Sequence, residues 1–79
     1  MFYVCILFSK SQPARHYIGL TSDLRERLSQ HNSGTCSHTA KSRPWQIETA
    51  ISFHSKQKAA AFEKYLKSGS GREFARRDF

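Results

Sequence analysis

The stretch HYIGLTSDLRERLSQH, residues 16–31, contains the junction between one predicted strand and one predicted helix. Residues 16–20 fit a strand, and the short connection from the apolar run before them makes a hairpin the simplest pairing. Gly19 weakens this strand locally, and such a glycine often marks a bulge or a close approach of another backbone or a ligand. We therefore predict a structural role for Gly19, which leaves room at this point of the strand.

The helix of this stretch brings two chemically useful side chains together. Asp23 has the side chain of an N-cap residue, and Glu26 follows three positions later as its capping-box partner. Arg27 and His31 are four residues apart and therefore share one helix face, beside a stripe of leucines. Residues 32–34, Asn-Ser-Gly, favour a left-handed helix end. A cation and an imidazole are thus predicted to lie near the end of the preceding strand.

The rest of the chain completes one small domain. Residues 2–8 are apolar at every position, which is typical of a central strand buried on both faces. Residues 34–45 are predicted to be a polar loop, and residues 46–53 alternate as a half-exposed strand. The residues on the apolar side of that strand are Ile47, Ile51 and Phe53. A helix is predicted over residues 56–68, and a short last helix begins at a Ser-x-x-Glu capping box, Ser70 to Glu73. The whole chain is therefore predicted to form a mixed or antiparallel three-stranded sheet with about three helices.

Length and composition exclude several other classes of protein. A length of 79 residues suffices for one globular domain over residues 1–79. With 38% hydrophobic residues, the composition is too apolar for a disordered tail. No apolar run is long enough to span a membrane, and the first residues lack a basic leader, so we expect neither a membrane partner nor export. Cys5 and Cys36 do not make a disulfide framework, and we expect reduced thiols in the cytoplasm.

The formal net charge of +7 indicates a polyanionic partner. Residues 1–54 carry six Lys or Arg against three Asp or Glu, and residues 55–79 carry seven against three, so positive charge is densest in the last third. Nucleic acid is the commonest partner of this kind, although some basic soluble proteins have no such partner. The candidate DNA contacts are Lys64, Lys67, Arg72, Arg76 and Arg77.

Four side chains form a set suited to phosphodiester hydrolysis, although each one alone has a simpler explanation. Tyr17 alone fits packing in a strand, Arg27 and Glu63 alone fit charges on a helix surface, and His31 alone fits a surface position or a contact with the helix C-terminus. Hydrolysis needs an activated water, a cation on the phosphate and stabilisation of the leaving oxygen. Magnesium held through one or two carboxylates meets part of this need, and Glu63 is its candidate anchor. Arg27 would neutralise the phosphate, and Tyr17 would orient or deprotonate the water. We expect Tyr17, Arg27, His31 and Glu63 to face one shallow basic concavity.

Several motifs occur in a fixed order along the chain: Tyr17-Ile18-Gly19, Arg27, His31-Asn32, Phe62-Glu63-Lys64 and the run from Lys67 to Arg72. From about Phe2 to Phe79 the chain resembles the GIY-YIG nuclease superfamily, above all its small single-domain bacterial members related to the N-terminal catalytic domain of excinuclease. The resemblance implies an α+β fold with a small three-stranded antiparallel sheet flanked by about three helices. It also implies DNA endonuclease activity, of the kind used in DNA repair, with one Mg²⁺ or Mn²⁺ ion. By position, Tyr17, Arg27 and His31 are then catalytic residues and Glu63 is the metal ligand.

Cys5 is the main departure from the family pattern. The first motif of the family ends in a tyrosine that lines the site, and here that motif is Tyr3-Val4-Cys5. A thiol is shorter than a phenol and a weaker hydrogen-bond donor. The favoured interpretation is a metal-dependent DNA endonuclease of low sequence specificity, since so small a domain has little besides phosphate contacts and shape to read. The alternatives are a DNA-binding module with weak or lost catalysis, and an RNA-binding or RNA-processing protein.

A zinc site is the other metal chemistry that the sequence suggests. The candidate ligands are Cys36 and His38, together with His31 and Cys5. Their spacing is irregular compared with known zinc motifs, and Cys5 belongs to the predicted central strand. We therefore expect no zinc.

Overall fold

The computed structural model describes residues 1–35 and 37–78, and it contains an antiparallel sheet of three strands in the order β2-β1-β3. The strands are β1 (Phe2–Ser9), β2 (His16–Thr21) and β3 (Trp45–Phe53). The helices are α1 (Leu24–Ser33), α2 (Ser37–Ala40), α3 (Lys56–Leu66) and α4 (Gly69–Asp78). The α+β class, the antiparallel sheet and the central position of the first strand are confirmed. The loop predicted over residues 34–45 contains the short helix α2, which the sequence interpretation missed.

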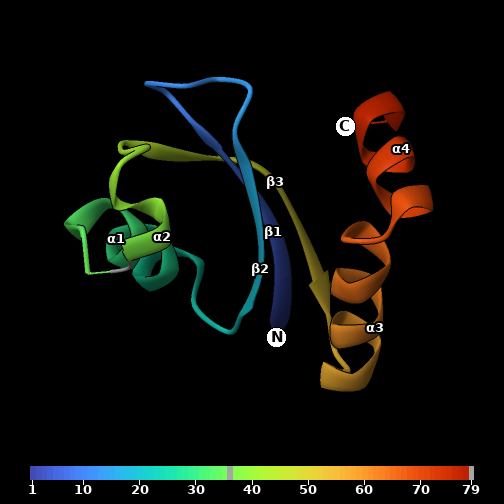
Figure 1. Ribbon diagram of the computed structural model, residues 1–79. Coiled ribbons are helices and arrows are strands. Elements are labelled where there is room, and N and C mark those ends of the chain that lie inside the picture. The colour runs from blue at the N-terminus through green and yellow to red at the C-terminus, as the bar shows by residue number, and fades with distance from the viewer. Residues whose placement is uncertain (36, 79) are drawn as a thin grey trace.

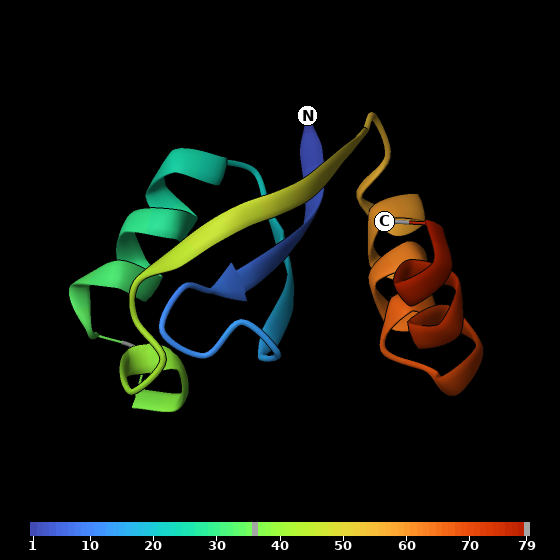
Figure 2. The same cartoon turned by 90° about the horizontal axis from the view of Figure 1, so that it is seen from above.

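The sheet separates two layers of helix. Helices α1 and α2 cover one face, and α3 and α4 cover the other (Figures 1 and 2). The α1-side cluster has Cys5, Leu7 and Trp45 at its centre, with leucines of α1 packed against it. The α3-side cluster has Val4, Ile6, Ala59 and Leu66 at its centre. The side chains of strand β1 thus alternate between two cores. Among the described residues, no helix is long and apolar enough to cross a membrane.

A bulge in β3 changes which face its side chains occupy. Leu7 pairs with Ile47 but Ile6 pairs with Thr49, so the register shifts by one residue at this point. Ile47 therefore packs in the α1-side cluster, whereas Phe53 packs against the α3-side cluster. The prediction that Ile47 and Phe53 share one side was wrong, because a β-bulge inserts one unpaired residue and reverses the alternation beyond it.

Both ends of α1 are fixed by local polar groups. The side chain of Asp23 accepts a hydrogen bond from the Glu26 amide at 3.0 Å, which confirms the predicted N-cap. The other half of the predicted capping box is replaced, since the Asp23 amide donates to the Thr21 hydroxyl at 3.0 Å. Gly34, with φ of +83°, ends the helix in the left-handed region as predicted. These contacts set the direction in which α1 leaves β2.

The joint between α3 and α4 depends on Gly71. A Cβ atom at Gly71 would overlap the carbonyl oxygen of Tyr65, so α4 packs directly on the last turn of α3. The cap of α4 is Ser68, whose hydroxyl accepts from the Gly71 amide at 3.2 Å. The predicted capping box of Ser70 and Glu73 was therefore wrong. The end of α4 nevertheless packs against the α3-side cluster through Phe74, as expected.

Replacing Gly71 with alanine (G71A) should lower the free energy of unfolding by about 2–3 kcal/mol, because backbone atoms cannot move aside as a side chain can. Gly69→Ala is the matched control, since an added Cβ there meets nothing within 4 Å. We expect G69A to stay within about 0.5 kcal/mol of the wild type. Urea unfolding of the three proteins measures this, and equal midpoints for G71A and the wild type would contradict the packing of α4.

Candidate active site

The α1 side of the sheet gathers the residues that the sequence singled out from β1 and β2. Cys5 lies opposite Gly19 in the antiparallel pair, and its thiol donates to the Gly19 carbonyl at 3.6 Å. A Cβ at Gly19 would lie 3.1 Å from the Tyr17 ring, so the ring crosses the space that this glycine leaves open. The group that comes close at Gly19 is thus the side chain of Tyr17, whereas the sequence suggested another backbone or a ligand.

His31 lies in the core of this side of the molecule. It is 2% exposed, and its ring centroid lies 4.5 Å from that of Tyr17. His31 Nδ1 lies 2.9 Å from the hydroxyl of Thr39 in α2, and Trp45 donates its indole N–H to the Thr39 carbonyl at 2.8 Å. The interpretation of His31 alone as a surface residue was therefore wrong, and its combination with Tyr17 has a structural basis.

The other ring nitrogen of His31, Nε2, is buried and has no hydrogen-bond partner among the described residues. Burial lowers the pKa of His31 below its ordinary value of 6.5, and the nearby Arg27 guanidinium lowers it further. The ring is therefore neutral near pH 7. When Nδ1 carries the proton and donates it to Thr39, Nε2 is an acceptor next to the Tyr17 ring. The two rings pack against each other, and no hydrogen bond joins Nε2 to Tyr17.

The depressed pKa of His31 predicts a pH dependence of stability. The unfolded chain takes up a proton on this histidine below about pH 6.5 and the folded chain does not, so stability is present above that pH and is lost as the pH falls. We expect the melting temperature to decrease between about pH 7 and pH 5, and to decrease less in His31→Gln. His54, an exposed histidine, provides the control, and an unchanged slope in H31Q alongside H54Q would contradict the burial of His31.

Arg27 is half-buried and anchored at the end of β2. Its Nη2 donates to the Leu20 carbonyl at 3.0 Å, which uses one of the five N–H donors of the guanidinium. The positive charge of Arg27 lowers the pKa of both His31 and Cys5. Arg27 therefore lies near both groups, as the shared helix face with His31 predicted, and it supplies the fixed positive charge of the site.

Cys5 is 1% exposed, and charged groups from both helix layers affect the pKa of its thiol. Burial raises the pKa of the Cys5 thiol, the Arg27 guanidinium lowers it, and the Glu63 carboxylate raises it. The thiol stays neutral and unreactive, so it does not replace a tyrosine phenol as an acid or base. The fields of Arg27 on α1 and Glu63 on α3 thus reach the same buried atom.

Glu63 has the properties of an anchor for a hydrated divalent cation. Its side chain is 24% exposed, and one carboxylate oxygen lies 3.5 Å from Lys67 Nζ. Among residues 1–35 and 37–78 no three His, Cys, Asp or Glu side chains gather as a metal cage. A single carboxylate fits Mg²⁺ or Mn²⁺, since Mg²⁺ keeps several waters and needs only one or two protein ligands. Cys36, weighed above for zinc, lies outside the described residues, so the absence of zinc stays a prediction.

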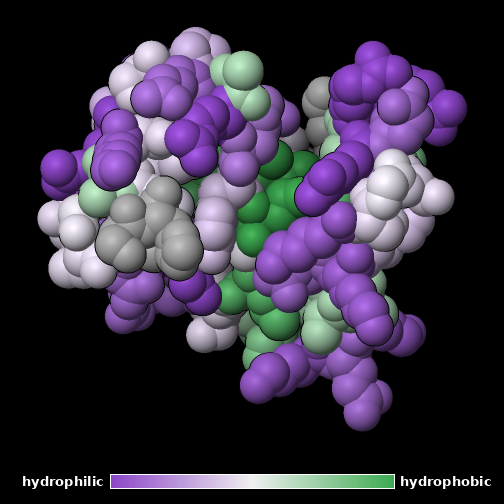
Figure 3. Space-filling model, viewed as in Figure 1, coloured by the Kyte–Doolittle hydropathy of each residue, from purple (hydrophilic) through white to green (hydrophobic). Residues whose placement is uncertain are grey.

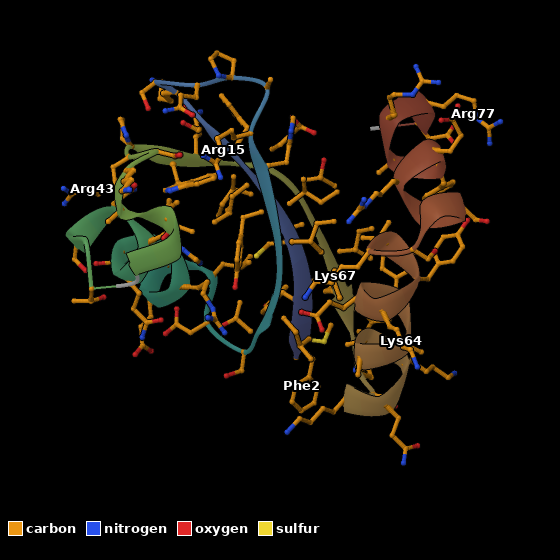
Figure 4. The ribbon with its side chains drawn as sticks, viewed as in Figure 1. Phe2, Arg15, Arg43, Lys64, Lys67 and Arg77 are labelled. Atoms are coloured by element: carbon orange, nitrogen blue, oxygen red, sulfur yellow. The ribbon has the colours of Figure 1, made fainter. Side chains whose placement is uncertain are left out.

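The basic residues of the last third do not form one surface. Lys67, Arg72 and Arg76 line a cleft between the sheet and α4. Lys67 extends from α3 toward the sheet, whereas Lys64 and Arg77 point away from it (Figure 4). Three of the five predicted DNA contacts are therefore placed together beside the sheet, and Lys64 and Arg77 are not among them.

Three residues that support the site escaped the sequence interpretation. Thr39 and Trp45 hold the His31 ring, as described above, and Asn32 ties α1 to β3. The Asn32 amide donates to the Trp45 carbonyl at 3.0 Å and accepts from the Trp45 amide. The His31-Asn32 motif pointed to a role for Asn32. Its partner Trp45 lies on β3, however, and the contact between α1 and β3 depends on the tertiary fold.

Known proteins are similar in sequence to most of this chain. Residues 1–77 match the profile of the family described as GIY-YIG catalytic domain. The chain is 39% identical over 69 residues to the structure-specific endonuclease subunit slx1 of Schizosaccharomyces japonicus, covering 80% of this chain and 25% of that protein. It is 42% identical over 53 residues to a UPF0213 protein of Streptococcus pneumoniae, covering 66% of this chain and 54% of that protein. The chain thus spans about a quarter and about half of these two relatives.

Proposed function

The chain belongs to the GIY-YIG family of catalytic domains, and on this basis we propose that it is a DNA endonuclease that uses one Mg²⁺ or Mn²⁺ ion and has low sequence specificity. The observation that carries the proposal is the arrangement around Cys5. Tyr17 and His31 are in ring contact beside it, and the charges of Arg27 and Glu63 both reach its thiol. The proposal is supported by a phenol, an imidazole and a guanidinium close together on the α1 side, with the Glu63 carboxylate on the α3 side close enough to affect the same thiol.

Each side chain has a role that follows from its contacts. Glu63 would hold the ion, which when bound supplies positive charge to the phosphate. Arg27, anchored by one N–H, keeps further donors for the phosphate oxygens. Tyr17 would orient the attacking water, and His31, packed against the Tyr17 ring, would hold that ring in place. The thiol of Cys5 is buried and takes no part in proton transfer.

The second candidate function is DNA binding without cleavage. It is favoured by Cys5, because a buried thiol stands where the family pattern has a tyrosine that lines the site. RNA binding or processing is the third candidate. A cytoplasmic location is proposed on the strength of the free thiol of Cys5, and a role in DNA repair on the structure-specific endonuclease activity named for the slx1 relative.

The experiment that tests the proposal is cleavage of labelled single-stranded, duplex and branched DNA, and of matched RNA, with Mg²⁺, Mn²⁺ or EDTA. The endonuclease proposal predicts internal cuts in at least one DNA with either ion and none with EDTA. Binding to DNA with no product under any of these conditions supports the second candidate instead. Cuts in RNA alone support the third.

The salt dependence of DNA binding should report the cations that face the sheet. With Arg27, Lys67, Arg72 and Arg76 engaged, the slope of log K against log salt should be about −3 to −4. Arg72→Ala should reduce its magnitude by about one, and Lys64→Ala, whose side chain points away, should leave it unchanged. Fluorescence anisotropy across a salt series measures both slopes, and a flat dependence would exclude this surface as the DNA site.

A further inference from the structure

A cleft of about 820 Å³ lies between the sheet and α4, beyond the α1-side residues of the candidate active site. Its floor consists of Ile6, Ile18, Leu66 and Ala75, which belong to the α3-side cluster. Figure 3 shows apolar residues at the bottom of a hollow with hydrophilic residues along both sides. The volume falls in the range of about 300–1,000 Å³ that is typical of small-molecule sites. The cleft therefore has the size and floor to accept one nucleobase with its sugar.

The rim of the cleft is basic. Lys67, Arg72 and Arg76 contribute three cations from the helices, against Glu48 from β3. Arg76 is paired with Glu73 and Lys67 with Glu63, whereas Arg72 has no ion-pair partner in the described part of the chain. This charge is complementary to phosphates, and an apolar floor beneath cations suits a base attached to a phosphodiester backbone.

Two residues connect the cleft to the candidate active site. Tyr17 lines the cleft and is in ring contact with His31 on the α1 side. Lys67 also lines the cleft, and its ammonium lies 3.5 Å from the Glu63 carboxylate. The cleft therefore shares Tyr17 with the candidate active site and adjoins it through the Lys67–Glu63 ion pair.

We propose that the cleft binds one unpaired nucleoside of the DNA strand being cut, with the base on the apolar floor and the flanking phosphates on Lys67, Arg72 and Arg76. This inference rests on the proposed function, because the site beside the cleft is taken to hold the scissile phosphate. A base that is paired and stacked in a duplex cannot enter without being flipped out, which costs a few kcal/mol. The preferred ligand is thus DNA with an unpaired nucleotide next to the cut.

Binding in EDTA tests the inference without any cleavage. A labelled DNA hairpin with a single-stranded extension should bind the wild-type protein about tenfold more tightly than the same hairpin with a blunt end, in keeping with the burial of one base face on an apolar surface. Ala75→Phe places a ring in the floor and should remove this preference while the affinity for the blunt hairpin is kept. Ala61→Phe, on an exposed position of α3, is the matched control and should retain the preference.

The different failures are distinguishable. A wild-type protein that binds both hairpins equally, or an A75F variant that keeps the preference, overturns the inference even where Mg²⁺-dependent cleavage is observed. An RNA extension that binds as tightly as the DNA extension overturns the assignment to DNA. If A75F does not fold, a titration of the wild-type protein with deoxyadenosine monophosphate followed by NMR decides. Shifts at the methyl groups of Ile6, Ile18 and Ala75 support the site, and shifts elsewhere or none refute it.

Discussion

Replacing Glu63 with glutamine (E63Q) should reduce metal-dependent cleavage by about a thousandfold or more while DNA binding is retained. The amide keeps the size of the side chain and removes the charge that would hold the ion, and Glu63 is the carboxylate that raises the pKa of the Cys5 thiol. Loss of a negative charge cannot weaken attraction to phosphate directly. Single-turnover cleavage and anisotropy at one fixed salt concentration measure the two quantities.

The matched control for E63Q is Glu73→Gln. Glu73 is an exposed glutamate of α4 that pairs with Arg76, so its loss removes the same charge and an ion pair of the same type. We expect E73Q to cleave within about threefold of the wild type, because exposed ion pairs contribute little to stability. Equal activity of E63Q and E73Q would remove Glu63 from the site and with it the proposed place of the metal ion.

Replacing Arg27 with alanine (R27A) should reduce cleavage by about a thousandfold and DNA affinity by a smaller factor. A well-placed arginine in phosphoryl transfer is worth roughly that much in rate, because it meets charge that grows in the transition state. Its contact with phosphate in the bound state accounts for the weaker effect on affinity. Arg27→Lys should recover only part of the rate, since an ammonium cannot both hold the Leu20 carbonyl and present a planar fork to the phosphate.

Arg25→Ala provides the control for R27A. Arg25 lies on the same helix but is exposed, so it tests the loss of one positive charge near α1 without the anchored guanidinium. We expect R25A to cleave at nearly the wild-type rate, with affinity lowered slightly. If R25A and R27A fell by the same factor, Arg27 would act through general electrostatic attraction and not through a fixed contact with the reacting phosphate.

The local parts of this fold were predictable from the sequence. The apolar run of β1, the Asp23 N-cap and the Gly34 helix end each depend on neighbouring residues, and each was found where it was expected. The bulge in β3 was not predictable, since residues 46–53 alternate regularly and the extra residue is set by pairing with β1. The short helix α2 was missed because polar residues of a loop and of a four-residue helix look alike.

Sequence spacing predicted one part of the candidate site, the shared helix face of Arg27 and His31, but not its environment. Spacing placed Arg27 and His31 on one face, and the structure agrees. The burial of His31 depends on Thr39 and Trp45, which reach it only through tertiary packing, so the sequence offered no sign of a neutral ring. Only the family resemblance grouped Glu63 with the α1-side residues, because α3 lies on the other face of the sheet from α1.

One divalent ion bound at Glu63, within reach of the residues around Cys5, is central to the proposed function. Paramagnetic broadening by Mn²⁺ in NMR spectra of the labelled protein tests this most directly. We predict broadening at the amides of Glu63, Gly19 and Leu20, reversed by excess Mg²⁺ and absent in E63Q. Broadening confined to other acidic residues such as Glu73 and Asp78, with the signals of Glu63 and Gly19 left sharp, would contradict a metal site at Glu63.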